Sequence, residues 1–275
     1  MNREYHYLIA SLPDLVGPEE SPNHPFPGFL EFCREQMPPS DIDLLCSCFF
    51  LNDVKNVCRY AQNEGNYVNP SYYSREFFDE ALVDKDLFLP FISDFFFDLD
   101  AGTRLYPDVP PENELLIRLF ENIEAHFESF IRDYLYFELH CRNISTALSH
   151  RSLDLDYTGK IIPADFISER ILQSNAPDFG LGGDIGLFEP VLDRFGNTAP
   201  IEIEKTIERI RWNWLDEAVG YRMFSRDAVI TYAIKLQSVE RWLELSPDDG
   251  RKMLDVLIQQ AREKSSAIHD ENTEV

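Results

Sequence analysis

The sequence predicts an all-α protein that forms a single helical domain over residues 1–275. Apolar residues recur at helical spacing in several long segments, and no segment alternates apolar and polar residues as a half-buried strand would. Val and Ile, which favour strands, are outnumbered by Phe, Leu, Glu and Asp. With 44% hydrophobic and 13% aromatic residues, the chain can build a substantial core and does not have the composition of a disordered protein.

The helices can be placed along the chain from their start and stop signals. Ser40, Ser225 and Ser246 suit N-cap positions, and Pro111 suits the first turn of a helix. In chain order, we expect helices at 28–37, 41–62, 71–82, 88–99, 112–149, 163–174, 200–222, 226–245 and 246–266. The segments 13–27, 65–70, 152–162 and 175–186 are rich in Pro, Gly or polar residues and are expected to be loops. The last residues, 267–275, are expected to be a disordered tail.

Three of these helices carry similar apolar rows, which suggests an internal repeat. The rows are Leu44, Cys48, Leu51, Val54, Cys58 and Ala61; Phe127, Ile131, Tyr134, Phe137, Cys141 and Ile144; and Val229, Ala233, Leu236, Val239 and Leu243. A short local similarity, called the echo here, pairs residues 54–57 (VKNV) with residues 141–144 (CRNI), which lie 87 positions further along the chain. The first two apolar rows, in contrast, match when the sequence is shifted by 83 positions. We therefore expect pseudo-repeats around 28–100, 111–174 and 200–266, and the sequence leaves the alignment of one repeat on the next undecided.

Three of the five cysteines lie in the segment DLLCSCFFLNDVKNVCRYA, where Cys46 and Cys48 form a C-x-C pair. On a helix these two thiols differ by about 200° in direction, so they cannot share a zinc ion or form a disulfide. No second ligand pair accompanies them. We interpret Cys48 and Cys58 as small core residues in a chain that keeps its thiols reduced.

No catalytic, cofactor-binding or metal site is predicted. The glycine-rich stretch DFGLGGDIG lacks the glycine that a dinucleotide fingerprint needs at its sixth position, where Ile185 stands, and no Walker lysine follows it. Glu121, Glu124 and Glu128 share one face of a predicted helix near His126, which is more typical of a solvated face than of a metal site. An enzyme that assembles its site from scattered carboxylates stays an alternative, because helical enzymes can do so.

The net charge of −24 constrains the partners of the chain. Each third of the sequence is net acidic, so nucleic acid and anionic lipid are unfavourable partners, while a basic protein would be attracted. No segment has the roughly 20 apolar residues of a membrane span. We expect a cytoplasmic protein that does not insert into the membrane.

Interface residues cannot be named from the sequence, but two segments are places to look. Phe95, Phe96 and Phe97 together span about 200° of a helix surface, so one of them tends to face outward unless helices pack on both sides, and internal packing is favoured. The second segment is the glycine-rich loop from Gly180 to Gly186.

The segment FSRDAVITYAIKLQSVERWLEL, residues 224–245, resembles the last repeat of the C-subunit family of V/A-type ATPases, whose eukaryotic member is the d-subunit of V-ATPases. Ser225, Val229, Tyr232, Val239 and Leu243 carry the resemblance, and the asparagine-containing helices at 52–57 and 139–144 are similar to the earlier repeats. The opening YHYLIASLPDL resembles that of a short bacterial branch encoded among V-type ATPase genes.

This resemblance implies a funnel of three pseudo-repeated helical units without catalytic activity of its own. A protein of this kind links the membrane rotor ring to the central stalk of a bacterial V/A-type rotary ATPase, on the cytoplasmic face of the membrane. The resemblance leaves open whether protons or sodium ions are coupled and whether ATP is made or consumed. Apart from the resemblance, the acidic charge is also consistent with an adaptor for another complex.

Overall fold

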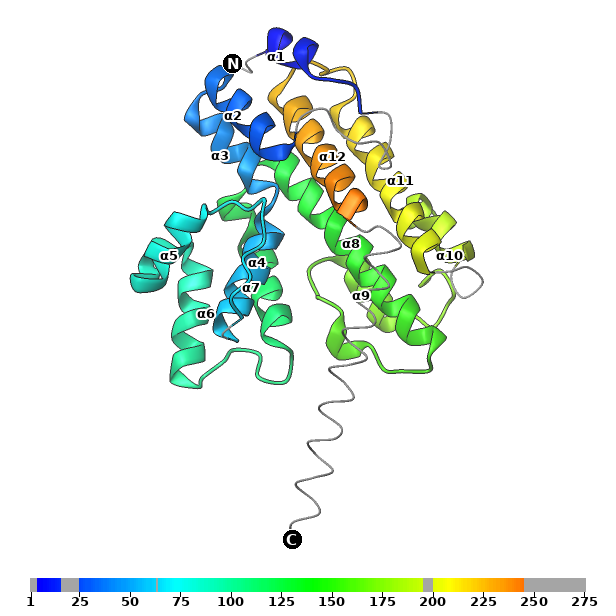
Figure 1. Cartoon of the computed structure of the whole chain (residues 1–275). Helices are drawn as coiled ribbons and strands as arrows, with labels where there is room; N and C mark the ends of the chain where they lie inside the picture. Colours follow the sequence, from blue (N-terminus) through cyan, green and yellow to red (C-terminus); the bar gives the residue numbers. More distant parts are fainter. Residues whose placement is uncertain (1–3, 16–24, 63, 195–199, 245–275) are drawn as a thin grey trace, which may run out of the picture.

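In the computed structural model, described here for residues 4–15, 25–62, 64–194 and 200–244, the chain is all-helical (Figure 1). The described residues contain no strand, only an isolated bridge between Glu4 and Ser225. The α-helices are α1 (His6–Ser11), α2 (Phe26–Gln36), α3 (Pro39–Ser47), α4 (Phe50–Ala61), α5 (Arg75–Val83), α6 (Pro90–Ala101), α7 (Pro111–His126), α8 (Ser129–Ser152), α9 (Phe166–Gln173), α10 (Glu189–Arg194), α11 (Pro200–Val219) and α12 (Arg226–Glu244). Short 3-10 helices cover Lys85–Leu87, Thr158–Lys160 and Gly182–Phe188. The all-α prediction is confirmed.

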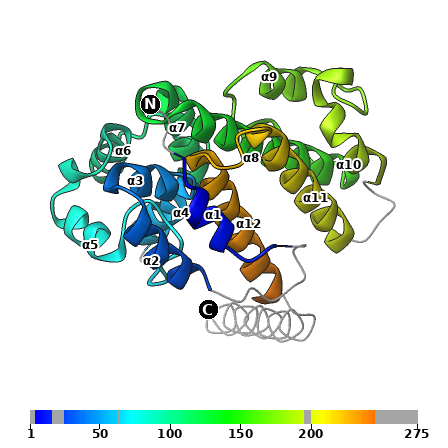
Figure 2. The same cartoon turned by 90° about the horizontal axis from the view of Figure 1, so that it is seen from above.

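The helices form two wings joined by a central group. In Figures 1 and 2, α5 and α6 lie on one side of the molecule, α9 and α10 lie on the other, and α8 and α12 run between them. In the first wing, α7 packs on both α4 and α6, and in the second, α9 packs on α8 and α10 on α11. The central α12 packs on α2, α3 and α11, and therefore connects the start of the chain to its C-terminal half.

The helix expected over 41–62 is broken into two. α3 ends at Ser47 and α4 begins at Phe50, with Cys48 and Phe49 between them. The first helix also starts earlier than expected: Pro38 is its N-cap residue and Pro39 occupies its first position, so Ser40 lies inside the helix and is not the cap. The apolar row runs across the break, because Cys48 keeps a helical backbone (φ −66°, ψ −17°) and Cys48 and Phe49 are both buried.

The long helix expected over 112–149 is likewise two helices, α7 and α8. Phe127 has an extended backbone (φ −123°, ψ 140°), and Glu128 is the N-cap residue of α8. Phe127 is buried against Phe50, with ring centroids 5.0 Å apart. Burial of this ring fixes the turn, and nothing in the local sequence signals it, since neither Gly nor Pro is present.

The other expected helices lie close to their predicted positions, although several start later. α5 starts at Arg75, where the Ser74 hydroxyl accepts a hydrogen bond from the Phe77 amide at 3.1 Å, and not at residue 71. The structure adds the short α1 and α10, and the glycine-rich loop contains a 3-10 helix, Gly182–Phe188. The helix expected at 246–266 and the tail at 267–275 lie outside the described residues.

The core is rich in aromatic side chains. Phe50 is fully buried and contacts the rings of four residues that come from three parts of the chain: Tyr72, Tyr73, Phe91 and Phe127. In the triple-Phe segment, Phe95 and Phe96 are buried, while Phe97 is 73% exposed. The expected internal packing therefore holds for two of the three rings, and the third faces outward as helix geometry requires.

Asn56 of α4 and Asn143 of α8 make the same pair of hydrogen bonds. The Asn56 side chain accepts from the Val68 amide at 2.7 Å and donates to the Val68 carbonyl at 3.1 Å. The Asn143 side chain accepts from the Ile162 amide at 3.1 Å and donates to the Ile162 carbonyl at 2.9 Å. Both asparagines are buried, so each satisfies two backbone groups of the loop that follows its helix. These are the two asparagines of the echo at offset 87.

Candidate functional site

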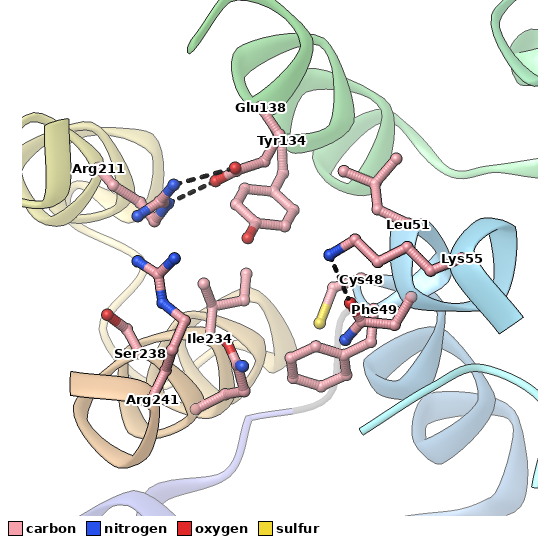
Figure 3. A pocket seen from close by; sticks show the side chains of 12 residues that line it. Cys48, Phe49, Leu51, Lys55, Tyr134, Glu138, Arg211, Ile234, Ser238 and Arg241 are labelled. Atoms are coloured by element: carbon pink, nitrogen blue, oxygen red, sulfur yellow. Dashed lines mark hydrogen bonds and ion pairs between the residues drawn. The ribbon is translucent and has the colours of Figure 1, made fainter. Parts of the chain in front are cut away.

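A hollow of about 140 Å³ lies between segments that are far apart in the sequence: residues 48–55, 134–138, 211 and 234–241. Helix α4 and the turn before it line one side, α8 and α11 line the second, and α12 lines the third (Figure 3). The lining residues are Cys48, Phe49, Leu51, Asn52, Lys55, Tyr134, Glu138, Arg211, Ile234, Gln237, Ser238 and Arg241. The hollow is thus bordered by each of the three helices that carry the recurring apolar rows: α4, α8 and α12.

A buried ion-pair network builds the wall of the hollow between α8, α11 and α12. Arg211 of α11 donates to both carboxylate oxygens of Glu138, at 2.5 and 3.0 Å, and to Glu208 at 2.5 Å. Glu208 is fully buried and also accepts from the Trp212 indole at 3.0 Å, from Arg241 at 3.0 Å and from the Ser238 hydroxyl. Charge-assisted bonds of this kind are stronger than neutral ones, so the network holds the three helices together and fixes the Arg211 side chain.

The ion pair between Glu208 and Arg211 keeps both residues ionised despite their burial. Burial alone would raise the pKa of Glu208, but the charges of Arg211 and Arg241 and the hydrogen bond from Ser238 bring it below its ordinary value. Burial disfavours the charged form of Arg211 as well, but Glu138 and Glu208 raise its pKa well above the ordinary value. The wall therefore carries fixed charges near neutral pH.

Lys55 and Tyr134 face the hollow without a strong partner. The Lys55 ammonium is directed into the hollow in Figure 3, and its one hydrogen bond is to the Asn52 side-chain oxygen at 3.3 Å. Burial lowers the pKa of Lys55, and the charge of Arg241 lowers it further while Glu112 and Glu138 oppose this change. The Tyr134 side chain is 8% exposed and points its hydroxyl into the hollow, where no hydrogen-bond partner lies among the described residues.

A second hollow of about 150 Å³ adjoins the first, between α4, α7 and α8. The two share Leu51, Lys55 and Glu138 in their walls. Arg142 also lines the second hollow, and its guanidinium donates to the Asn113 side chain at 2.8 Å and to the Lys160 carbonyl at 3.1 Å. Burial lowers the pKa of Arg142, and Glu112 opposes this shift. Lys55 and Arg142, the charged residues of the two echo segments, thus both border the second hollow, and Lys55 borders the first as well.

The residues considered for metal binding are used elsewhere in the structure. Glu121 accepts a hydrogen bond from the Tyr106 hydroxyl at 2.7 Å, Glu124 pairs with Arg132, and Glu128 pairs with Arg226. Within the described part of the chain, no three His, Cys, Asp or Glu residues are grouped as metal ligands. The cysteines are free thiols, and burial raises the pKa of Cys58 to about 12 and that of Cys48 well above its ordinary value.

Sequence reasoning missed the residues that form the hollow's charged wall. Glu208 and Arg211 lie on α11 among the buried residues Ile203, Ile207 and Ile210. A carboxylate and a guanidinium on the apolar face of a helix signal a buried ion pair, because such charges are rarely buried alone. Arg241 carries the same signal on α12, where it follows Ile234 and Ser238 on one face.

Comparison with known proteins places the chain in a family. A model of the family described as "Protein of unknown function (DUF2764)" matches residues 1–265. The chain belongs to this family. No curated protein and no solved structure matches it. In addition, no helix in the described ranges of this DUF2764 protein combines the length and the apolar character needed to cross a membrane.

Proposed function

We propose that this DUF2764 protein is a non-catalytic coupling subunit, which links the membrane rotor ring to the central stalk of a bacterial V/A-type rotary ATPase. The proposal starts from the resemblance of residues 224–245 to the last repeat of the C-subunit family. It places the protein on the cytoplasmic face of the membrane, held there by its partners and not by insertion.

The observation that carries the proposal is the shared hydrogen-bond pattern of Asn56 and Asn143. Two side chains at the echo positions clamp the loop after their helix through the same two backbone contacts. This match favours the register of 87 over that of 83 for the first two units. Together with the hollow that α4, α8 and α12 border, it supports a repeated arrangement around a central opening, as the resemblance to the C-subunit family implies.

The rigidity of the centre is also consistent with a part that transmits torque. The Arg211 network connects α8, α11 and α12, and the aromatic contacts of Phe50 connect α4 to α6 and to the turn before α8. Close-packed interiors of this kind transmit strain instead of absorbing it.

Binding to purified central-stalk subunits tests this proposal. We expect the isolated chain to form a stoichiometric complex with them on size-exclusion chromatography at physiological salt. An unrelated acidic helical protein of similar net charge serves as the control for nonspecific attraction. Failure of the chain to bind any stalk subunit, under conditions in which the stalk subunits bind one another, would contradict the proposal.

The net charge of −24 favours one alternative, an acidic adaptor for another complex with a basic partner. Attraction of this kind between exposed charges is screened by salt over about 8 Å at physiological ionic strength. The adaptor role predicts a complex that forms at low salt and dissociates as salt is raised. The coupling role predicts a complex with the stalk that persists, because it would rest on a packed interface.

A further inference from the structure

The hollow between α4, α8, α11 and α12 has the opposite charge from the rest of the chain. The chain carries 49 acidic and 25 basic residues, yet three of the four charged residues lining the hollow are cationic: Lys55, Arg211 and Arg241. Glu138 is the fourth, and both of its carboxylate oxygens accept hydrogen bonds from Arg211. Together with the buried Glu208, the lining residues carry three positive and two negative charges.

Two of its polar groups remain available to a ligand. The Lys55 ammonium has three donors and makes one long hydrogen bond, to Asn52 at 3.3 Å. The Tyr134 hydroxyl lies on a side chain that is more than nine-tenths buried, and no described residue accepts from it or donates to it. Because this hydroxyl opens onto the hollow, it is free to bond to water or to a ligand there.

Two of the three donors that face the hollow are held in place by their own contacts. Arg241 is fixed by its bond to Glu208, and Tyr134 is fixed by the packing of its ring against Trp214, with centroids 6.1 Å apart. Lys55 is the one flexible donor, carried on a four-carbon stem that can adjust to an anion. An ammonium, a guanidinium and a phenol that face one opening match the acceptors of a tetrahedral oxyanion.

We propose that this hollow binds a single phosphoryl group, held by Lys55, Arg241 and the Tyr134 hydroxyl. The volume of about 140 Å³ holds several water molecules but is below the roughly 300 Å³ at which sites for drug-sized ligands begin. The ligand is therefore free phosphate, or one phosphoryl group of a nucleotide whose remainder stays outside. The site does not depend on the proposed coupling role, because it rests on the isolated chain alone.

Isothermal titration of the full-length protein with inorganic phosphate tests the proposal, with ADP as the second ligand and acetate at matched ionic strength as the anion control. We expect saturable phosphate binding with a dissociation constant of about 1 mM or below. Tighter binding of ADP than of phosphate would assign the site to a nucleotide, and weaker binding of ADP would assign it to free phosphate. Acetate should bind at least about tenfold more weakly, since it offers fewer acceptors.

Two substitutions remove the donors separately. Lys55→Met keeps the length of the stem and should weaken phosphate binding about tenfold, and Tyr134→Phe keeps the buried ring and should weaken it about fivefold. Arg75→Gln removes an exposed cation that pairs with Asp79 on α5, and should leave the affinity unchanged. The far-ultraviolet circular dichroism and the unfolding midpoint of each variant establish that it is folded.

The proposal would be overturned by any of three results: no saturable binding of phosphate or ADP, equal affinity for acetate, or equal affinity in wild type, Lys55→Met and Tyr134→Phe. The last result would place any observed binding elsewhere on the surface. Because the test uses the isolated chain and a small ion, its failure is distinguishable from a failure to bind the stalk subunits.

Discussion

Glu208 and Arg211 lie three residues apart on α11 and form an ion pair of 2.5 Å on the buried face of that helix. Glu208 has no exposed surface, and its carboxylate gathers donors from α11 and α12, while Arg211 extends the network to Glu138 of α8. This pair makes the wall of the central hollow a polar structure inside an apolar bundle. Removing the charge of Glu208 therefore tests most directly whether this network holds α8, α11 and α12 together.

We expect Glu208→Gln to lower the free energy of unfolding by about 3 kcal/mol, because it leaves Arg211 and Arg241 with one fewer buried counter-charge. Urea denaturation measures the change. The matched control is Glu202→Gln on the same helix, whose side chain is 45% exposed and pairs with Lys205 at 3.6 Å. It should change the free energy by less than about 1 kcal/mol. Equal effects of the two substitutions would contradict the structural role of the network.

The two asparagine clamps should be of similar strength. We expect Asn56→Ala and Asn143→Ala each to lower the free energy of unfolding by about 2 kcal/mol, since each leaves a backbone amide and a carbonyl without a partner. Hydrogen exchange of the Val68 amide in the first variant, and of the Ile162 amide in the second, should accelerate.

Asn213→Ala is the control for these variants, because Asn213 is exposed on α11 and alanine favours a helix. It should leave the stability unchanged or slightly raised. If only one of the clamp variants accelerates exchange in its own loop, the two units are not equivalent, and the support that the clamps give to a repeat is withdrawn.

We expect Asp165 to contribute stability that is lost at low pH. It is the N-cap residue of α9, where it accepts hydrogen bonds from the Ser168 amide at 2.9 Å and from His140 at 2.6 Å. Partial burial favours a higher pKa, but these hydrogen bonds outweigh it and lower the pKa of Asp165 from 3.8 to about 2. Since the folded pKa lies below the unfolded one, the contribution is complete above pH 3.8 and is lost as the pH falls through about 2.

The free energy of unfolding, measured from pH 6 down to about pH 2, checks this contribution of about 2 kcal/mol. In the Asp165→Asn variant, the free energy of unfolding should fall less steeply with pH between pH 3.8 and about 2. An unchanged slope in the variant would mean that other carboxylates account for the acid sensitivity.

The aromatic core gives a paired test of burial. Phe50→Ala should cost about 4 kcal/mol, because it opens a cavity among four other rings. Phe97→Ala removes the same side chain from a site that is 73% exposed and should cost less than about 1 kcal/mol. A large loss from Phe97→Ala in the isolated chain would show that this ring packs against something that the described residues do not include.

Much of the fold could be predicted from the sequence because many helix ends have local signals. Pro90 begins α6, Gly102 ends it with a left-handed backbone (φ +70°), and Ser225 precedes α12. The breaks at Cys48 and at Phe127 have no such signal, because they depend on rings and thiols that pack against distant parts of the chain. When apolar residues keep their helical spacing across such a turn, the spacing predicts one continuous helix where the structure has two.

The candidate site was harder to predict from the sequence, because none of its charged residues belongs to a recognisable motif. Lys55, Glu138, Arg211 and Arg241 come from four helices and meet only in the folded chain. The echo around Asn56 and Asn143 contains Lys55 and Arg142, but it points to a repeat and not to the hollow that both residues line. A carboxylate on the apolar side of a predicted helix, as at Glu208, is the local pattern that would have pointed to the network.

Co-purification from membranes tests the coupling role most directly. The chain is tagged in its source cell, the membranes are solubilised in mild detergent, and the captured proteins are identified by mass spectrometry. We predict that the rotor-ring, central-stalk and ATP-hydrolysing subunits of a V/A-type ATPase are recovered together with the tagged chain. Recovery of soluble proteins alone, or of no partner, from membranes in which that ATPase is intact would contradict the coupling role.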